Sequence, residues 1–330
     1  MNLNNGNSND VRLVEKLSES VKDIKTEVHK VIVGQEEIID NILTAIFSGG
    51  HTLLVGVPGL AKTLLIKTIA DVLNLNFSRI QFTPDLMPGD ITGTEIIEEN
   101  NLTKGREFKF IRGPIFANII LADEINRTPP KTQSALLEAM QEHNVTAMGK
   151  TYKLEEPFFV LATQNPIEQE GTYPLPEAQL DRFMFNLWLD YPSYQEEIEI
   201  IKSTTSEIIP EINKVITKEE IIEFQNLVKR VPVADNVIEY AISKVKATRP
   251  AETESTELKG WINWGAGPRA SQYLIIAAKA RAIMDGRYTP AVDDVKASLI
   301  PVLRHRIIPN FNAEADGITS LDIINKLIEN

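Results

Sequence analysis

The stretch Gly56-Val57-Pro58-Gly59-Leu60-Ala61-Lys62-Thr63 has the residue types and spacing of a phosphate-binding loop. It follows an apolar run, His51 to Val55, that predicts a strand, and it precedes helical spacing that begins at Leu64. The backbone N–H groups of such a loop surround a phosphate, and the helix N-terminus adds partial positive charge. Lys62 can then reach the β- and γ-phosphates of a nucleotide, and the Thr63 hydroxyl can bind Mg²⁺.

The loop departs from the common pattern at Ala61, where a glycine usually precedes the lysine. The methyl group of Ala61 is expected to exclude a positive φ without closing the loop. A chance glycine turn before a helix is the alternative. The near-complete pattern between a predicted strand and a predicted helix favours the phosphate loop.

Two carboxylates, Asp123 and Glu124, follow a continuous apolar run, Ile119 to Ala122, that predicts a strand buried on both faces. Ligands of doubly wound sheets bind at the carboxyl ends of strands. Asp123 can therefore hold Mg²⁺ through water, and Glu124 can orient and polarise an attacking water. An acidic pair that merely caps the next helix is the alternative, but the upstream phosphate loop favours catalysis.

Three further polar residues could assist phosphoryl transfer. Asn165 ends the neighbouring apolar strand, and its amide could hold the attacking water; the alternative is an Asn-Pro turn residue. Arg182 and Arg269 could place positive charge on the developing oxyanions. Taken alone, each arginine is more often a solvated surface residue.

Composition excludes several classes of protein. The chain has 330 residues, a formal net charge of −12, four His and no Cys. Disulfides, thiolate metal sites and a cysteine nucleophile are therefore excluded, and bulk electrostatic binding of nucleic acid or anionic lipid is not expected. No apolar run approaches the ~20 residues of a membrane span, and Met1 to Asp10 lacks a signal-peptide pattern. We expect a cytoplasmic protein.

The chain divides into two parts of different character. Strand and helix signals alternate up to about residue 190, which predicts an α/β fold with a doubly wound parallel sheet. Helical spacing dominates afterwards. We expect a disordered tail at 1–10, an α/β nucleotide-binding domain at 11–192 and a helical domain at 193–330, in which residues 249–268 form a long polar connection.

Two segments of the α/β part interrupt the alternation. Residues 91–111 hold two β-prone stretches around a polar segment, which predicts a hairpin or protruding insert, with a plain surface loop as the alternative. Residues 145–154, with Gly149-Lys150 in the middle, predict a second hairpin.

In combination, these motifs resemble the MoxR group of AAA+ ATPases over nearly the whole chain. The most specific passages are the phosphate loop, Leu121 to Arg127, and Ala162 to Phe183. Ala61 before the lysine is itself typical of this family. The resemblance implies a P-loop AAA+ domain followed by an all-α helical lid, and an ATPase that uses ATP and Mg²⁺.

The resemblance also implies a role for each residue. Asp123 and Glu124 match the Mg²⁺-associated and catalytic acids, and Asn165 matches the first sensor. Arg182 matches the arginine finger, which acts on ATP in the neighbouring subunit, and Arg269 matches the second sensor. Thr63 and Asp123 would hold the metal. The ATP-binding residues would be Val33, Gly34, Gln35, Gly56, Val57, Pro58, Gly59, Leu60, Ala61, Lys62, Thr63 and Leu64.

Members of this family are thought to be ring-forming remodelling chaperones that mature client complexes or insert cofactors into them. The resemblance therefore implies a homo-oligomer in the form of a hexameric ring, a protein client and a von Willebrand A-domain partner. The insert at 91–111 and the hairpin at 145–154 match elements that often contact substrate in related ring ATPases.

Two other functions compete with this hypothesis. A nucleic-acid motor or loader of the same clade is the first, but the acidic net charge and the lack of a long basic run weigh against it. A GTPase-like switch is the second, and it would need an Asn-Lys-x-Asp motif. Asn213-Lys214 and Asn325-Lys326 both lack the following Asp.

Overall fold

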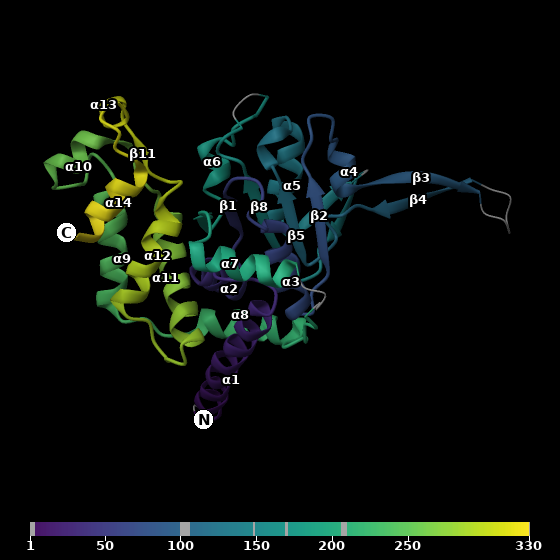
Figure 1. Ribbon diagram of the computed structural model, residues 1–330, viewed down its shortest axis with the longest axis horizontal. Coiled ribbons are helices and arrows are strands. Elements are labelled where there is room, and N and C mark those ends of the chain that lie inside the picture. The colour runs from purple at the N-terminus through teal and green to yellow at the C-terminus, as the bar shows by residue number, and fades with distance from the viewer. Residues whose placement is uncertain (1–3, 100–105, 148, 169–170, 206–209, 330) are drawn as a thin grey trace.

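A five-stranded parallel sheet forms the centre of the α/β part (Figure 1). The structure is a computed structural model that describes residues 4–99, 106–147, 149–168, 171–205 and 210–329. The strand order is β2-β5-β8-β1-β9, and every neighbouring pair is parallel. The predicted doubly wound sheet is therefore confirmed. The strands are β1 (Thr52–Val55), β2 (Phe77–Gln81), β5 (Ile119–Asp123), β8 (Phe159–Gln164) and β9 (Phe185–Trp188).

Helices cover both faces of this sheet, and successive strand residues point to opposite faces. Leu121 packs in the core shared with the helices that precede β2, whereas Ile120 and Ala122 pack in the core shared with the helix that follows β5. This explains why β5 is fully buried and reads as a continuous apolar run. The helices are α1 (Asn4–His29), α2 (Glu36–Ser48), α3 (Lys62–Val72), α4 (Pro88–Thr92), α5 (Pro130–Glu142) and α6 (Glu177–Leu180), with the short 3₁₀ helix Ile125–Arg127 after β5.

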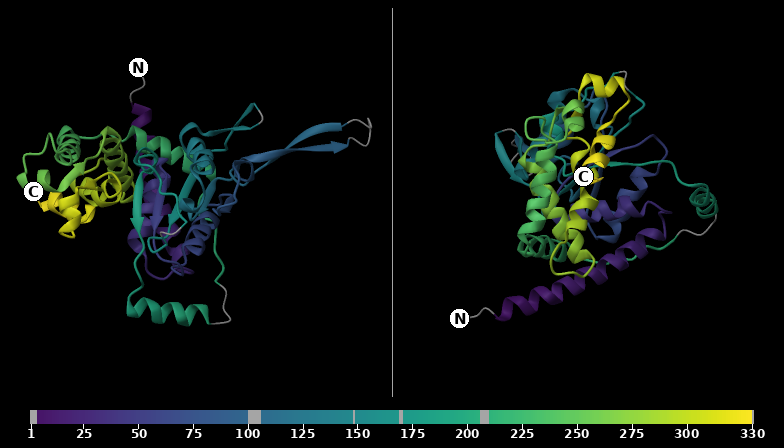
Figure 2. Two further views of the ribbon diagram at one scale, coloured as in Figure 1. Left: turned by 90° about the horizontal axis from the view of Figure 1, so that it is seen from above. Right: turned by 90° about the vertical axis from the view of Figure 1, so that its left-hand side faces the viewer.

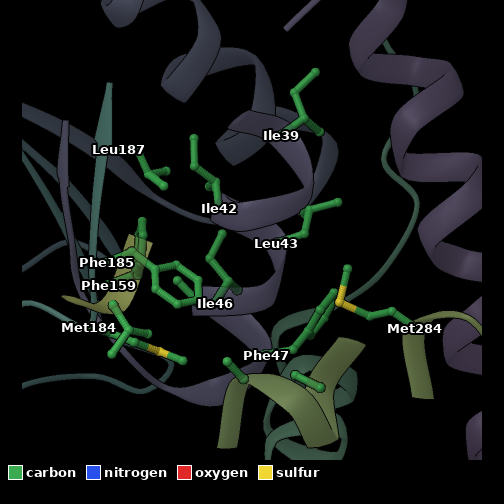
Figure 3. Packing of buried hydrophobic residues seen from close by; sticks show 14 of the residues in the cluster. Ile39, Ile42, Leu43, Ile46, Phe47, Phe159, Met184, Phe185, Leu187 and Met284 are labelled. Carbon is green, nitrogen blue, oxygen red and sulfur yellow. The ribbon is translucent and has the colours of Figure 1, made fainter. Parts of the chain in front are cut away.

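Helix α2 lies at the centre of the larger core (Figure 3). Ile42, Ile46 and Phe47 are buried there against β9 and the C-terminal helices. The helix ends at Gly49, whose φ of 67° is the left-handed conformation that favours glycine. Because α2 contacts both parts of the molecule, its packing fixes the five-stranded sheet relative to the helical part.

The expected disordered tail at residues 1–10 is wrong for residues 4–10, which form the first turns of α1. Helix α1 buries one apolar face, including Leu17 and Ile24. Once such a helix has formed, each added residue gains a hydrogen bond without a new nucleation cost, so the asparagine-rich segment extends it.

The C-terminal part is a bundle of helices beside the sheet (Figure 1). The described helices are α8 (Lys218–Arg230), α9 (Asp235–Ala247), α10 (Thr256–Trp261), α11 (Pro268–Met284), α12 (Val292–Leu303), α13 (Phe311–Ala315) and α14 (Ser320–Glu329). A short antiparallel pair, β10 (Ile262–Trp264) and β11 (Ile308–Pro309), joins them. Residues 249–268 therefore contain α10 and β10, and the expected long connection is wrong there.

Helix α7 (Tyr194–Thr204) links the two parts and stands away from the body of the molecule (Figure 2). None of its residues is buried. No described helix is long and apolar enough to pass through a bilayer.

The interruption at 91–111 is a hairpin arm rather than a plain surface loop (Figures 1 and 2). Strands β3 (Gly93–Glu99) and β4 (Arg106–Arg112) pair antiparallel, and the residues between them lie outside the described ones. The second predicted hairpin is also confirmed, as β6 (Asn144–Ala147) and β7 (Lys150–Lys153). The rings of Phe110 and Tyr152 stack at 4.5 Å, so the bases of the two hairpins are in contact.

Candidate active site

The phosphate loop leads from β1 into α3, as predicted. The prediction that Ala61 has a negative φ is wrong, because its φ is 53° and its ψ is 24°. Its carbonyl accepts the N–H of Leu65 at 2.9 Å, so the strained residue begins the helix. A left-handed alanine costs about 1–2 kcal/mol, a cost that the formation of α3 offsets. The small methyl group makes this conformation tolerable in the tight loop.

The ammonium group of Lys62 lies inside the loop. Nζ donates to the carbonyls of Gly56 at 2.5 Å and Val57 at 3.0 Å. Burial lowers the pKa of Lys62, and the nearby carboxylates of Asp123 and Glu124 oppose that shift. The carbonyls of the loop therefore hold the Lys62 side chain in the cavity that the two acids also line.

Two adjoining cavities meet at the phosphate loop. The first, which we call the phosphate-side cavity, has a volume of about 480 Å³. It is lined by Pro58, Gly59, Leu60, Ala61, Lys62, Thr63, Leu64, Arg79, Gln81, Asp123, Glu124, Thr163 and Asn165. The second, which we call the base-side cavity, has a volume of about 550 Å³. It shares Gly59 to Ala61 and Leu64 with the first, and it extends between α7, β9 and α12. Val33 and Gln35 line the second cavity, whereas Gly34 lies between them and packs toward Glu196. A polar chamber and a more apolar chamber in series suit the phosphates and the base of a nucleotide.

Asp123 lies at the carboxyl end of β5 with both carboxylate oxygens engaged. Its Oδ1 accepts the hydroxyl of Thr163 on β8 at 2.6 Å. Its Oδ2 accepts Nε and Nη2 of Arg79 on β2 at 3.1 and 2.6 Å. Strands on either side of β5 therefore fix this carboxylate at the rim of the phosphate-side cavity.

Glu124 is the next residue and has a left-handed backbone, with φ 57° and ψ 50°. Non-glycine residues in this region cost about 1–3 kcal/mol and cluster at functional sites. Its N–H donates to Thr163 Oγ1 at 2.9 Å, and its Oε2 accepts Gln81 Nε2 at 3.1 Å and Arg127 Nε at 2.9 Å. The strained turn and these contacts direct the carboxylate toward the cavity that Asp123 also lines.

Asn165 follows β8 and lines the same cavity, with 7% of its surface exposed. Its side-chain oxygen accepts the N–H of Ile167 at 3.1 Å. The Asn-Pro turn interpretation is thus correct for the oxygen. The amide nitrogen is the group that could donate to a water or phosphate.

The structure does not bring Arg182 and Arg269 to this cavity. Arg182 donates to the carbonyl of Leu137 on α5 at 2.6 Å and lines a separate cavity of about 240 Å³. Arg269, at the start of α11, pairs with Asp181 at 3.3 Å. Asp181 also pairs with Arg306 at 2.7 Å, and the Arg306 side chain is only 2% exposed. The two predicted arginines therefore line neither cavity at the phosphate loop, and Arg269 pairs with the residue that precedes Arg182.

Sequence reasoning missed four residues that organise these groups. Arg79 and Gln81 were not singled out, although polar residues two apart near the end of a strand share one face of it. Thr163 and Arg306 have partners, Asp123 and Asp181, that lie about 40 and 125 positions away in the chain. No local pattern could have indicated those two pairings.

Comparison with known proteins now bears on this geometry. The model of the ATPase family associated with various cellular activities (AAA) matches residues 51–185, and the AAA lid domain model matches residues 256–327. Chaperone MoxR1 of Mycobacterium tuberculosis is 44% identical over 304 residues, which cover 92% of this chain and 79% of that protein. The chain belongs to the MoxR family of AAA+ ATPases.

Two further relatives agree with this assignment. YeaC of Bacillus subtilis, a protein described as uncharacterized, is 43% identical over 302 residues and 91% of each chain. The crystal structure of a candidate ATPase from Cytophaga hutchinsonii is 44% identical and superimposes with a TM-score of 0.89 over 96% of each chain. This MoxR-family protein is accordingly an ATPase with a nucleotide-binding AAA+ domain and a helical lid.

Proposed function

We propose that this protein is an Mg²⁺-dependent ATPase that works as a ring, most simply a hexamer, and remodels protein clients. The observation that carries the proposal is the separation of the two arginines from the phosphate-side cavity. A relative that covers most of the chain is named a chaperone, which supports the remodelling role.

The residues of the phosphate-side cavity fit ATP with Mg²⁺. Mg²⁺ is commonly held by one or two carboxylates together with substrate phosphates. Among the described residues no group of three or more acids or histidines could form a metal cage. Thr63 and Asp123 would share the ion with the phosphates, and once bound it would neutralise charge that develops on them.

The other side chains of this cavity can divide the work of hydrolysis. Lys62 supplies fixed positive charge to the phosphates. Glu124 can accept a proton from the attacking water, and the amide of Asn165 can orient that water. Val33, Gly34 and Gln35 would lie along the base in the adjoining cavity.

Arg182 and Arg269 would act on ATP bound to a neighbouring subunit. Positive charge beside the transferred phosphoryl group stabilises the negative charge on its oxygens, and arginine fingers supplied in trans are worth about 10³ to 10⁵ in rate. Each arginine is held by a partner in its own subunit: Arg182 by the carbonyl of Leu137 on α5, and Arg269 by the carboxylate of Asp181. A ring in which one subunit completes the next would give both arginines a target.

Mixed oligomers test this arrangement. Lys62→Ala removes the phosphate contact and Arg182→Ala removes the finger, so each variant alone is expected to be nearly inactive. Mixing the two should restore part of the ATPase activity, because some interfaces then combine an intact loop with an intact finger. No recovery in oligomers shown by mass spectrometry to be mixed would contradict catalysis in trans.

The client and partner are proposed on family grounds: a protein complex that is matured or receives a cofactor, and a protein with a von Willebrand A domain.

The competing motor function predicts steep, salt-dependent stimulation by nucleic acid. With a net charge of −12, we expect DNA and RNA to leave ATPase activity unchanged at about 0.15 M salt. A von Willebrand A-domain protein should change the ATPase activity. Strong, salt-sensitive stimulation of that activity by DNA would favour the motor function instead.

A further inference from the structure

Arg79 forms a salt bridge with Asp123, the aspartate proposed to hold the metal. Its guanidinium donates through Nε and Nη2 to one oxygen, Oδ2 of Asp123. The Arg79 side chain is 46% exposed, and that of Asp123 is 12% exposed. Arg79 also lines the phosphate-side cavity. A half-exposed cation thus reaches over a nearly buried anion at the place where phosphates would bind.

The two oxygens of Asp123 differ in how easily they can be released. The donor to Oδ1 is the hydroxyl of Thr163, a residue that is 1% exposed and also accepts the N–H of Glu124. The donor to Oδ2 is Arg79, which has solvent on one side. A metal or its water shell at Asp123 would therefore take the place of Arg79 and leave Thr163 where it is.

Charge makes the two occupants alternatives. Mg²⁺ and a guanidinium at the same carboxylate oxygen would repel each other strongly across a partly buried site. Arg79 has a second partner on its own strand, because Nη2 also donates to Oε1 of Gln81 at 2.5 Å. Gln81 in turn donates to Glu124 at 3.1 Å. The arginine thus has a second anchor from which it can remain beside the acids without holding Asp123.

We propose that Arg79 is a positioning residue that neutralises Asp123 until Mg²⁺ replaces it, and so reduces the dependence of nucleotide binding on the metal. The inference rests on the proposed metal-holding role of Asp123. Without metal, the phosphates would meet an Arg79–Asp123 pair instead of a bare carboxylate. When Mg²⁺ is present, the ion must first displace Arg79 from Asp123, and this cost weakens the binding of the ion.

The sign of this effect makes it testable by binding alone. We would measure the dissociation constant of N-methylanthraniloyl-ATP on the full chain by fluorescence, in excess EDTA and in excess Mg²⁺. In Arg79→Ala, the EDTA constant should rise and the Mg²⁺ constant should stay or fall. The dissociation constant in EDTA divided by that in Mg²⁺ should therefore be about five-fold or more larger in Arg79→Ala than in the natural protein.

Three other variants control for folding and charge. Arg230→Ala breaks an exposed Arg–Asp pair, with Asp10, in which the arginine is 48% exposed, and it removes the same charge away from the cavity. Its ratio should equal that of the natural protein. Arg79→Lys keeps the charge and should restore most of the ratio. Arg79→Gln gives the same test as the alanine variant if that one fails to fold.

Specific results would overturn the inference. If both dissociation constants stay unchanged in folded Arg79→Ala and Arg79→Gln, Arg79 has only a structural role. Equal weakening in EDTA and in Mg²⁺ would make it a direct phosphate ligand instead. If Arg79→Ala bound nucleotide no better in Mg²⁺ than in EDTA, the proposed metal site would fail, and that outcome is separate from any effect of Arg79 because the variant lacks it.

Discussion

The hydroxyl of Thr163 donates to Oδ1 of Asp123 at 2.6 Å across two neighbouring strands. The same hydroxyl oxygen accepts the N–H of Glu124 at 2.9 Å, so one buried side chain contacts both of the acids proposed to act in hydrolysis. Strand β8 thereby sets the position of the acids that end β5. The relationship links the packing of the sheet directly to the proposed chemistry.

Thr163→Val should show how far this hydroxyl contributes to stability and how far it contributes to ATP hydrolysis. Valine has the shape of threonine without the hydroxyl, so the N–H of Glu124 loses its partner in a nearly buried site. We expect a loss of about 1–3 kcal/mol in the free energy of unfolding and a drop in ATP turnover of more than ten-fold, with ATP binding retained. Urea unfolding and steady-state assays check both. Thr146→Val, at an exposed threonine of β6, should change neither.

Glu124→Gln should keep ATP binding and lose hydrolysis. The amide preserves the size of the side chain but cannot accept a proton from water, so turnover should fall on the order of 10² to 10⁴-fold. Equilibrium binding and single-turnover rates measure the two effects separately. Glu314→Gln on α13 is the control for the charge change. Normal turnover in the Glu124 variant would remove this residue from the catalytic role.

Asp181→Asn should destabilise the protein through Arg306. The Arg306 guanidinium is almost fully buried and relies on Asp181 for its counter-charge. Removing one partner of such a pair leaves an uncompensated buried charge, and because Asp181 is itself 33% exposed we expect a loss of about 2 kcal/mol. Asp10→Asn breaks an exposed pair with Arg230 and should cost less than about 1 kcal/mol. Equal losses in urea unfolding would contradict the importance of burial.

Trp188 should report nucleotide binding. It lines the base-side cavity, and the guanidinium carbon of Arg304 lies 4.0 Å from the centre of its ring. A base entering this cavity would change the polarity around the indole or disturb the stack. We expect nucleotide to change the tryptophan emission of the protein and of Trp264→Phe, but not of Trp188→Phe. A full signal in Trp188→Phe would place the base elsewhere.

The sequence predicted what depends on local pattern. Apolar runs predicted the strands, and the loop spacing placed Lys62 and Thr63 at the start of a helix. The positive φ of Ala61 could not be predicted, because it is set by the closure of the loop rather than by the residue. The grip of Arg79 on Asp123 depends on β2 lying beside β5, a pairing between strands about 40 residues apart. Tertiary pairing of that kind leaves no local signal.

The histidines make stability depend on pH in a direction that can be worked out. Burial lowers the pKa of His51 from 6.5 to about 4. Its Nδ1 accepts the N–H of Val160 at 3.0 Å, and its Nε2 lies 3.1 Å from the carbonyl of Met140, so the neutral ring fits both partners. The unfolded chain takes up this proton near pH 6.5 and the folded chain only near pH 4. The free energy of unfolding should therefore fall by about 3 kcal/mol as pH drops across that window.

His143 should behave in the opposite way. Its hydrogen bond to Glu156 at 2.7 Å raises its pKa, so the stability from this pair is present at lower pH and is lost as pH rises through the raised value. Proton NMR can follow both rings: the His51 resonance should not shift between about pH 5.5 and 8, whereas that of His143 should titrate above 6.5. His143→Gln should remove only the loss at high pH. A His51 ring that titrates near 6.5 would mean that its burial does not hold in solution.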